Sequence, residues 1–282
     1  MKVLITGSTG MLGSNLLRFL PYNTIGFSST ELDITNIQTC FQVLDNIQPN
    51  VIIHAAAYTN VEDCEIDPNK AFLINTIGTQ NLVNWSLNKE VLFIYISSTG
   101  IYGNHKTNEP YNEFDTVSPT TIHHKSKYEG EKSVQNHLKK FLILRTGWLF
   151  GGDKELNKNF VYKRFLEAKS SQKIFSDVSQ IGNPTYIVDL ITQIEILIKN
   201  NCYGIFNCIN RADNISRFDY VKKIIEYSKL NCAVEIAPQN MFKRVAPVSN
   251  NESAINYKLN LMGINMMGDW DKALRKYIDN LL

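Results

Sequence analysis

The stretch KVLITGSTGMLG, residues Lys2–Gly13, decides the fold of this chain. It opens with the apolar run Lys2–Thr6, which is typical of a buried strand, and Ser14–Leu20 after it has the pattern of a helix. The turn between them has a glycine at every third position, at Gly7, Gly10 and Gly13. Glycine lets the backbone turn sharply and approach a pyrophosphate, and a helix N-terminus offers N–H groups and a positive dipole. We therefore predict a dinucleotide-binding turn, with a purely structural turn as the alternative.

The same alternation of apolar runs and helical segments continues to about residue 150. Further strands are predicted at Thr24–Phe27, Val51–Ile53, Val91–Ile96 and Phe141–Leu144. Helices are predicted between them, ending near Ile47 and spanning Pro68–Lys89 and Thr120–Leu138. Strands and helices that alternate with short links are typical of a parallel, doubly wound sheet. We predict an α/β Rossmann fold in which residues 1–152 bind the dinucleotide and later segments return to the sheet.

Beyond Gly152 the alternation is less regular. The pattern predicts helices at Asn159–Ser171, Ile187–Asn200, Arg217–Leu230 and Trp270–Leu281, and short strands at Lys173–Phe175 and Gly204–Cys208. Ser216 is placed to cap the third of these helices. We predict that residues 153–282 mostly form a smaller substrate-binding lobe over the strand ends. Scattered cations, Arg211 and Arg217 among them, are available there to a phosphorylated ligand, although surface solubility explains most of them.

Composition argues against several classes of protein. The chain has 282 residues, a net charge of +2 and mixed charges, so neither nucleic acid nor a membrane surface is an expected partner. No apolar run has transmembrane length, and Lys2–Ile5 is too short for a signal-peptide core. Five scattered cysteines without CxxC spacing predict free thiols and no metal site. We expect a cytoplasmic protein.

The residues after the second strand bear on the choice of cofactor. A dinucleotide fold can place an acid here to hold the adenosine ribose of NAD. This chain has Ser28–Thr30 at that point, and Glu31 comes a little later. The serines suit the 2′-phosphate of NADP weakly, but no arginine accompanies them, so we expect NADP or NAD and favour NADP slightly. Asp33 and Thr35 are candidate caps of the next helix, and Asp33 is equally a candidate cofactor contact.

Small and hydroxyl residues end the next two predicted strands. Val51–Ile53 runs into His54 and then Ala55–Ala57, and Val91–Ile96 runs into Ser97–Gly100. Ligands of open α/β sheets bind beyond the carboxyl ends of the strands, where small residues leave room for them. Tight helix–sheet packing and turn formation are the competing interpretations, and His54 alone is more often a packed histidine than a ligand.

With these pieces in order, the chain resembles the extended short-chain dehydrogenase/reductases and, within them, the dTDP-4-dehydrorhamnose reductase family. The matching stretches keep the family's order over nearly the whole chain: TGSTGMLG (Thr6–Gly13), LDIT (Leu32–Thr35), PNVIIHAAAYTNVEDCE (Pro49–Glu65), NTIGTQNL (Asn75–Leu82), ISSTGIYG (Ile96–Gly103), KSKYEGEK (Lys125–Lys132), LRTGWLFG (Leu144–Gly151), GNPTYIVDL (Gly182–Leu190) and DWDKALRKYI (Asp269–Ile278). The resemblance implies an NAD(P)-dependent reductase of a nucleotide-linked 4-keto sugar in deoxysugar or polysaccharide biosynthesis, and it allows a homodimer. A nucleotide-sugar epimerase or dehydratase is the alternative enzyme.

The same resemblance implies roles for individual residues. It places the cofactor at Gly7, Thr9, Gly10, Met11, Leu12 and Gly13, at Asp33 and Ile34, and at Ala55, Ala56 and Ala57. Ser98 matches the catalytic Ser/Thr that hydrogen-bonds the substrate carbonyl. Lys127 matches the catalytic lysine, which binds the nicotinamide ribose and lowers the pKa of a tyrosine. Thr99 and Trp148 match substrate contacts, with Thr99 in place of the usual aspartate, and Tyr102 in the same loop is a further candidate substrate contact.

The tyrosine of the family's YxxxK motif is absent, because His123 stands four residues before Lys127. Tyr128 lies roughly 140° round the helix from His123, so it is a poor substitute, and Tyr102 is the other nearby phenol. A neighbouring cation disfavours imidazolium, so we expect His123 to be mostly neutral and a poor proton donor. Three outcomes remain open. His123 acts as the acid, a water or Tyr102 donates instead, or the chain is a cofactor-binding regulatory protein without redox turnover.

Overall fold

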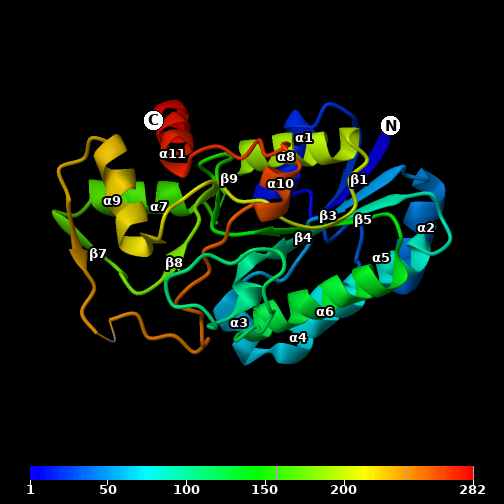
Figure 1. Cartoon of the computed structure of the whole chain (residues 1–282), viewed down its shortest axis with the longest axis horizontal. Helices are drawn as coiled ribbons and strands as arrows, with labels where there is room; N and C mark the ends of the chain where they lie inside the picture. The colour runs from blue at the N-terminus through cyan, green and yellow to red at the C-terminus, as the bar shows by residue number, and fades with distance from the viewer. Residues whose placement is uncertain (157, 240, 282) are drawn as a thin grey trace.

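The computed structural model describes residues 1–156, 158–239 and 241–281 (Figure 1). Six strands form one parallel sheet in the order β10-β5-β4-β3-β1-β2. They are β1 (Lys2–Thr6), β2 (Asn23–Phe27), β3 (Val51–His54), β4 (Leu92–Ser98), β5 (Phe141–Thr146) and β10 (Gly204–Asn207). The chain passes from β1 to β2 on one side and then to β3 on the other. The predicted Rossmann fold is therefore confirmed, with its topological switch point between β1 and β3.

Helices cover both faces of the sheet (Figure 1). One face carries α1 (Met11–Phe19) and α8 (Ile187–Lys199), and the other carries α2 (Ile37–Ile47), α5 (Gly78–Ser86) and α6 (Ile122–His137). Val3 and Ile5 pack with the first pair of helices, whereas Leu4 between them packs with the second group. Burial on both faces explains why the strands are continuous apolar runs. No helix in the described ranges is both long and apolar enough to cross a membrane.

The predicted helix Pro68–Lys89 consists of three consecutive helical segments. α4 (Pro68–Phe72) is followed by the π-helical turn η1 (Leu73–Ile77) and then by α5. The π turn contains Asn75, which accepts the backbone N–H of Tyr58 at 2.8 Å and donates to the Tyr58 carbonyl at 3.1 Å. Asn75 also donates to the hydroxyl of Ser126 on α6 at 3.0 Å. This amide therefore ties the segment after β3 to α6, and such π turns are frequent at functional sites.

The predicted caps of α2 are wrong. Asn36 caps this helix by accepting the N–H of Thr39 at 3.0 Å. Asp33 instead accepts the backbone N–H of Thr35 at 2.9 Å and its hydroxyl at 2.7 Å, which closes a turn before the helix begins. The short helix α3 (Val61–Ile66), capped by Asn60, was not predicted, because a single turn and a half shows little periodicity.

The remaining elements form a smaller unit beside the sheet (Figure 1). Helices α7 (Phe160–Lys169), α9 (Arg217–Tyr227) and α11 (Trp270–Leu281) pack around one apolar cluster. Three short strand pairs join them: β6 (Leu149–Phe150) with β9 (Thr185–Tyr186), β8 (Ile181–Gly182) with β11 (Ile215–Ser216), and β7 (Lys173–Ser176) with β12 (Ala233–Ile236). α10 (Tyr257–Leu261) lies against β10. Ser216 caps α9 as predicted, in a capping box with Asp219, whereas the division at residue 152 stays a prediction.

Candidate functional site

A cavity of about 1160 Å³ lies at the carboxyl ends of β1 to β5 and beside α6. Its wall includes every residue predicted to hold the cofactor: Gly7, Thr9, Gly10, Met11, Leu12, Gly13, Asp33, Ile34, Ala55, Ala56 and Ala57. Ser98, His123, Lys127 and Trp148 belong to the same wall. Drug-sized ligands occupy pockets of about 300–1,000 Å³, so this cavity has room for a ligand larger than those.

Each of the three positions in the first turn holds a glycine for a different physical reason. Gly7 has a φ of +71°, and a Cβ there would lie 2.8 Å from the backbone of Ala56. A Cβ at Gly13 would lie 2.1 Å from the carbonyl oxygen of Gly7. The turn itself therefore needs these two glycines. Gly10 has a φ of −75°, and a Cβ there would meet only the Gly7 oxygen, at 3.2 Å, so Gly10 leaves open space on the cavity side.

The N-terminus of α1 faces this space without a side-chain cap. Its first intrahelical hydrogen bond runs from the N–H of Ser14 to the carbonyl of Gly10, at 3.0 Å. The N–H groups of Met11, Leu12 and Gly13 have no acceptor among the residues that the structure describes. Free N–H groups at the positive end of a helix dipole form an anion site. The open cradle at Gly10 and these N–H groups fit the pyrophosphate of a dinucleotide.

An acidic group does reach the end of β2, although not from the expected position. The carboxylate of Glu31 accepts the hydroxyl of Ser28 at 2.7 Å and its backbone N–H at 2.8 Å. These two hydrogen bonds lower the pKa of Glu31. Ser29 lines the cavity beside Asp33, whereas Glu31 is not among the lining residues. This edge therefore presents hydroxyl groups to a ribose, with one carboxylate behind them.

His54 is a packed histidine. Its Nδ1 lies 2.7 Å from the hydroxyl of Thr6, and its Nε2 lies 3.1 Å from the hydroxyl of Thr79. Burial, and then the charge of Lys127, lower the pKa of His54 to about 3. The ring is therefore neutral, and it fixes the end of β3 against β1 and α5.

Ser98 lies at the end of β4 with its hydroxyl positioned for a ligand. It accepts the N–H of Gly100 at 3.2 Å, as the cap of the 3₁₀ turn η2 (Thr99–Tyr102). Because the hydroxyl oxygen accepts this bond, its proton is free to be donated into the cavity. Thr99 is only 1% exposed and is not part of the cavity wall. Its expected role as a substrate contact therefore has no support in its position.

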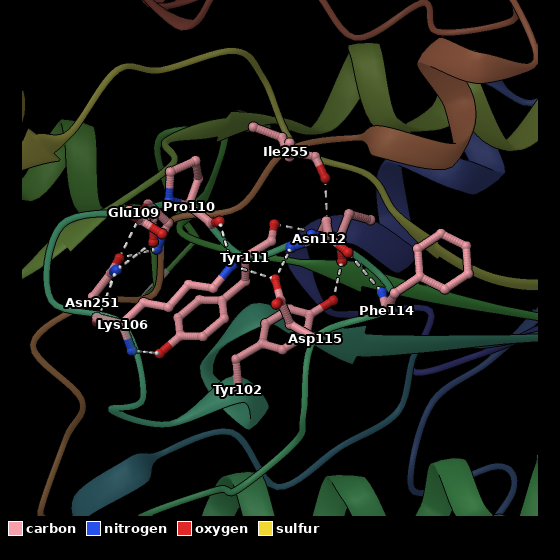
Figure 2. Close-up of polar contacts among 12 residues, drawn as sticks. Tyr102, Lys106, Glu109, Pro110, Tyr111, Asn112, Phe114, Asp115, Asn251 and Ile255 are labelled. Atoms are coloured by element: carbon pink, nitrogen blue, oxygen red, sulfur yellow. Dashed lines mark hydrogen bonds and ion pairs between the residues drawn. The ribbon is translucent and has the colours of Figure 1, made fainter.

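Tyr102 is not a proton donor for this cavity. Its hydroxyl donates to the Oδ1 of Asn207 at 2.8 Å and accepts from Arg145 at 3.1 Å. Its ring is fully buried and stacks on Tyr111 with 4.8 Å between the centroids, inside the cluster that Figure 2 shows around Lys106. Burial raises the pKa of Tyr102 to about 12. The expectation that Tyr102 contacts substrate or donates a proton is corrected, because its phenol is committed to the core.

His123 lies on the buried side of α6, one turn before Lys127. Its Nδ1 lies 3.0 Å from the carbonyl oxygen of Tyr58. A carbonyl only accepts, so Nδ1 carries the proton and Nε2 of the neutral ring carries a lone pair. Burial, together with His124 and Lys127, lowers the pKa of His123 well below its ordinary value. Neutral His123 therefore accepts a hydrogen bond at Nε2 but has no proton there to give.

Lys127 is a buried cation without a counter-ion. Its Nζ lies 4.0 Å from the centroid of the Tyr95 ring, and no hydrogen-bond or ion-pair partner occurs in the part of the chain that the structure describes. The nearby carboxylate of Glu131 is held by Arg145 in two contacts of 2.8 and 3.2 Å. Burial lowers the pKa of Lys127 to about 7, against the opposing effect of Glu131.

Trp148 lines the cavity in a strained conformation, with a φ of +44°. Its indole N–H donates to Glu252 at 3.0 Å, and the guanidinium of Arg217 lies 3.5 Å from the ring centroid. A Cβ at Gly182 would come within 2.5 Å of the indole, so this glycine makes room for it. Arg217 could be predicted only as one of several scattered cations and Glu252 not at all, because each joins Trp148 from a distant segment.

Two cations and one phenol of the cavity wall, Lys158, Lys70 and Tyr58, were not predicted as site residues. Lys158 hydrogen-bonds the hydroxyl of Thr59, and Lys70 lies 4.9 Å from the centroid of the Tyr58 ring. Tyr58 belongs to a matched stretch, but the two lysines come from segments without a recognisable motif. No signal in the sequence marked them.

Comparison with known proteins gives consistent results. A family model described as "RmlD substrate binding domain" matches residues 1–282. A dTDP-4-dehydrorhamnose reductase from Aggregatibacter actinomycetemcomitans is 31% identical, over 97% of this chain and 97% of the relative. The structure of a dTDP-4-dehydrorhamnose reductase from Clostridium acetobutylicum superimposes with a TM-score of 0.94, at 31% identity, and covers 100% of this chain and 99% of that one. A Bacillus anthracis structure of the same name, in complex with NADP, has a TM-score of 0.93, 33% identity and 99% coverage of both chains.

Proposed function

The chain belongs to the RmlD substrate-binding-domain family, and we propose that it is an NADP-dependent reductase of a nucleotide-linked 4-keto deoxysugar. One observation carries this proposal: a single cavity joins the open N-terminus of α1 to Ser98 and Lys127. Relatives named dTDP-4-dehydrorhamnose reductases support the class of sugar and a role in deoxysugar or polysaccharide biosynthesis. The NADP complex of the Bacillus anthracis relative supports the cofactor, with NAD as the alternative.

Bound in this cavity, the reduced nicotinamide supplies a hydride to the carbonyl carbon of the sugar. The cradle at Gly10 and the free N–H groups at the start of α1 bind the pyrophosphate. Ala55–Ala57 leave room for the nicotinamide half, and Lys127 binds its ribose. Ser98 donates its free proton in a hydrogen bond to the substrate carbonyl, which orients and polarises it. Trp148 bounds the space for the sugar.

Incubation with a dTDP-4-keto-6-deoxy sugar and either NADPH or NADH tests the proposal. We expect loss of the reduced nicotinamide and formation of one sugar alcohol for each molecule oxidised. The reaction should be followed across about pH 6 to 9, because the donor of the proton sets the optimum. No oxidation and no altered sugar over this range would refute a reductase of that substrate. An altered sugar without net oxidation would instead support an epimerase or dehydratase.

A second candidate function follows from His123, which cannot donate a proton from Nε2 in its neutral form. The chain would then bind the cofactor without redox turnover and serve as a regulatory subunit. Tight NADPH binding, no turnover on a panel of nucleotide sugars and co-purification with a partner enzyme would favour this role. Measured turnover would exclude it.

We also propose that the protein works in the cytoplasm and as a homodimer. Five free cysteines, four of them buried, support a reducing compartment. The homodimer rests on the family resemblance alone. Light scattering of the purified protein tests it, and a monomeric mass would refute it.

A further inference from the structure

We propose that Lys127, and not His123, delivers the proton to the carbonyl oxygen of the substrate, directly or through one water. This inference rests on the proposed reductase function. Reduction of a ketone needs a proton at oxygen as well as a hydride at carbon. At the position where the family resemblance implies a proton-donating tyrosine, this chain has His123, so another group in the cavity has to supply the proton.

The geometry of His123 excludes it as the proton donor. Its proton is on Nδ1, where the carbonyl of Tyr58 takes it, and this carbonyl is held in place by the amide of Asn75 at 3.1 Å. Only imidazolium would carry a proton on Nε2. Burial and the neighbouring cation at Lys127 both disfavour that form. His123 is therefore a positioning residue that accepts a hydrogen bond from the cavity.

The phenols near the cavity fail for other reasons. Tyr102 lies in the core with both sides of its hydroxyl paired. Tyr58 lines the cavity, but desolvation and the neighbouring carboxylates of Asp63 and Asp67 raise the pKa of its phenol. A phenol with a raised pKa is a poorer acid at neutral pH. Tyr95 contacts Lys127 with its ring and donates its own proton to the Lys127 carbonyl at 3.1 Å.

Lys127 has protons at the cavity wall, and these protons have no acceptor among the residues that the structure describes. On its own helix it faces His123 and Glu131, while β3 contributes His54, β4 contributes Tyr95 and β5 contributes Arg145. The two histidines are neutral, and the Glu131 carboxylate is paired with the guanidinium of Arg145. Within the described residues the ammonium therefore has no ion pair or hydrogen bond, and only the ring face of Tyr95 and the already paired Glu131 carboxylate stabilise it. An ammonium so poorly stabilised gives up a proton readily, in agreement with a pKa of about 7.

The step balances as follows. The carbonyl carbon receives a hydride from the reduced cofactor, and the electron pair of the C=O π bond moves to oxygen. An N–H bond of the Lys127 ammonium breaks and an O–H bond forms at that oxygen. Lys127 is left as a neutral amine, which takes up a proton from solvent before the next turnover. The cofactor is oxidised and the ketone is reduced to the alcohol.

The variant Lys127→Arg separates a proton donor from a fixed positive charge. Arginine keeps the cation and hydrogen-bond donors for the ribose, but it does not release a proton near neutral pH. We expect single-turnover NADPH oxidation with a 4-keto nucleotide sugar to fall by roughly 10²- to 10⁴-fold, the usual contribution of a general acid. NADPH affinity, measured by fluorescence titration, should change little. Lys125→Arg, on the exposed side of the same helix, is the matched control and should keep the native rate.

The pH dependence gives a second readout. The native single-turnover rate should fall as pH rises through the pKa of Lys127, and this break should persist in His123→Gln. A readout without substrate or cofactor is the NMR titration of ¹³C-labelled lysine in the free protein. The signal that disappears in Lys127→Arg should titrate near 7, against about 10.4 for an ordinary lysine.

Two kinetic results would overturn the inference while leaving a working reductase. One is Lys127→Arg turning over at close to the native rate. The other is a pH break that disappears in His123→Gln, which would assign the proton to the histidine. A free-protein titration near that of ordinary lysine would also overturn it. No NADPH oxidation by the native protein would refute the proposed function itself, and the inference with it.

Discussion

Gly10→Val should strongly weaken cofactor binding while the protein stays folded. The backbone at Gly10 has φ −75° and ψ 166°, which valine adopts readily. The added Cβ would meet only the carbonyl oxygen of Gly7, at 3.2 Å. Gly10 is the N-cap of α1, where glycine is preferred to valine, so we expect a loss of about 1 kcal/mol in unfolding free energy. That corresponds to a fall of roughly 2–4 °C in Tm.

The effect on affinity should be much larger. Valine would fill the space in front of the free N–H groups of Met11, Leu12 and Gly13. Hydrogen bonds to a charged group contribute about 1.5–3 kcal/mol each. Losing even a pair of them costs about 3–6 kcal/mol, which weakens binding by roughly 10²- to 10⁴-fold.

Fluorescence titration of NADPH, with thermal unfolding of each variant, measures the two effects separately. Gly13→Ala is the matched comparison, because its Cβ would lie 2.1 Å from the Gly7 oxygen. Overpacking of this kind costs about 1–3 kcal/mol, so Gly13→Ala should lose stability as well as affinity. A folded Gly10→Val with native NADPH affinity would refute the reasoning, because the pyrophosphate would then not lie against this turn.

Three further predictions follow from α6 and its contacts. His123→Tyr should raise single-turnover reduction about tenfold or more, because a phenol beside Lys127 can donate a proton; a slower variant would show that histidine is an adapted catalyst. Glu131→Gln should lower the unfolding free energy in urea by about 3–5 kcal/mol, because it leaves the buried Arg145 unpaired, and a loss below about 1 kcal/mol would contradict this. The folded-state pKa of Lys127, about 7, lies below the unfolded value of 10.5, so the unfolded chain binds more protons between these values and native stability rises with pH there. Lys127→Met should therefore stabilise the protein by ~3 kcal/mol in urea unfolding near neutral pH and much less near pH 10, whereas an equal gain at both would refute burial of the charge.

The central sheet could be predicted from sequence because the reasons for it are local. Each strand is buried on both faces, so it appears as an uninterrupted apolar run, as Val51–His54 does. Gly7 and Gly13 are fixed by close contacts within one turn. The short elements β12 and α10 could not be predicted, because four or five residues show no clear period.

Without the family resemblance, only those residues of the candidate site that follow a strand could be predicted from the sequence. The residues that follow each strand meet at one edge of the sheet, so their convergence follows from topology. The burial of Tyr102 was not predicted, because its position depends on contacts with Asn207 and Tyr111. Asn207 lies far from it in sequence, and Tyr111 lies in a loop without a motif. The position of the Glu31 carboxylate at the end of β2 could not be predicted, because two hydrogen bonds from Ser28 bring it there. Side-chain partners of this kind are set by tertiary contacts that no spacing encodes.

The replacement of tyrosine by His123 changes the direction of a hydrogen bond, and this matters more than the pKa of the ring. A phenol beside Lys127 would hold its one proton where a substrate oxygen can take it. A neutral imidazole carries one proton, on one of its two ring nitrogens. The carbonyl of Tyr58, 3.0 Å from Nδ1 of His123, holds this proton on Nδ1. Asn75 donates to the same carbonyl from the π turn, so the carbonyl cannot turn away without losing a second bond. The backbone after β3 thus makes His123 an acceptor towards the cavity, and this is why the proton of the proposed reduction is assigned to Lys127 at the same wall.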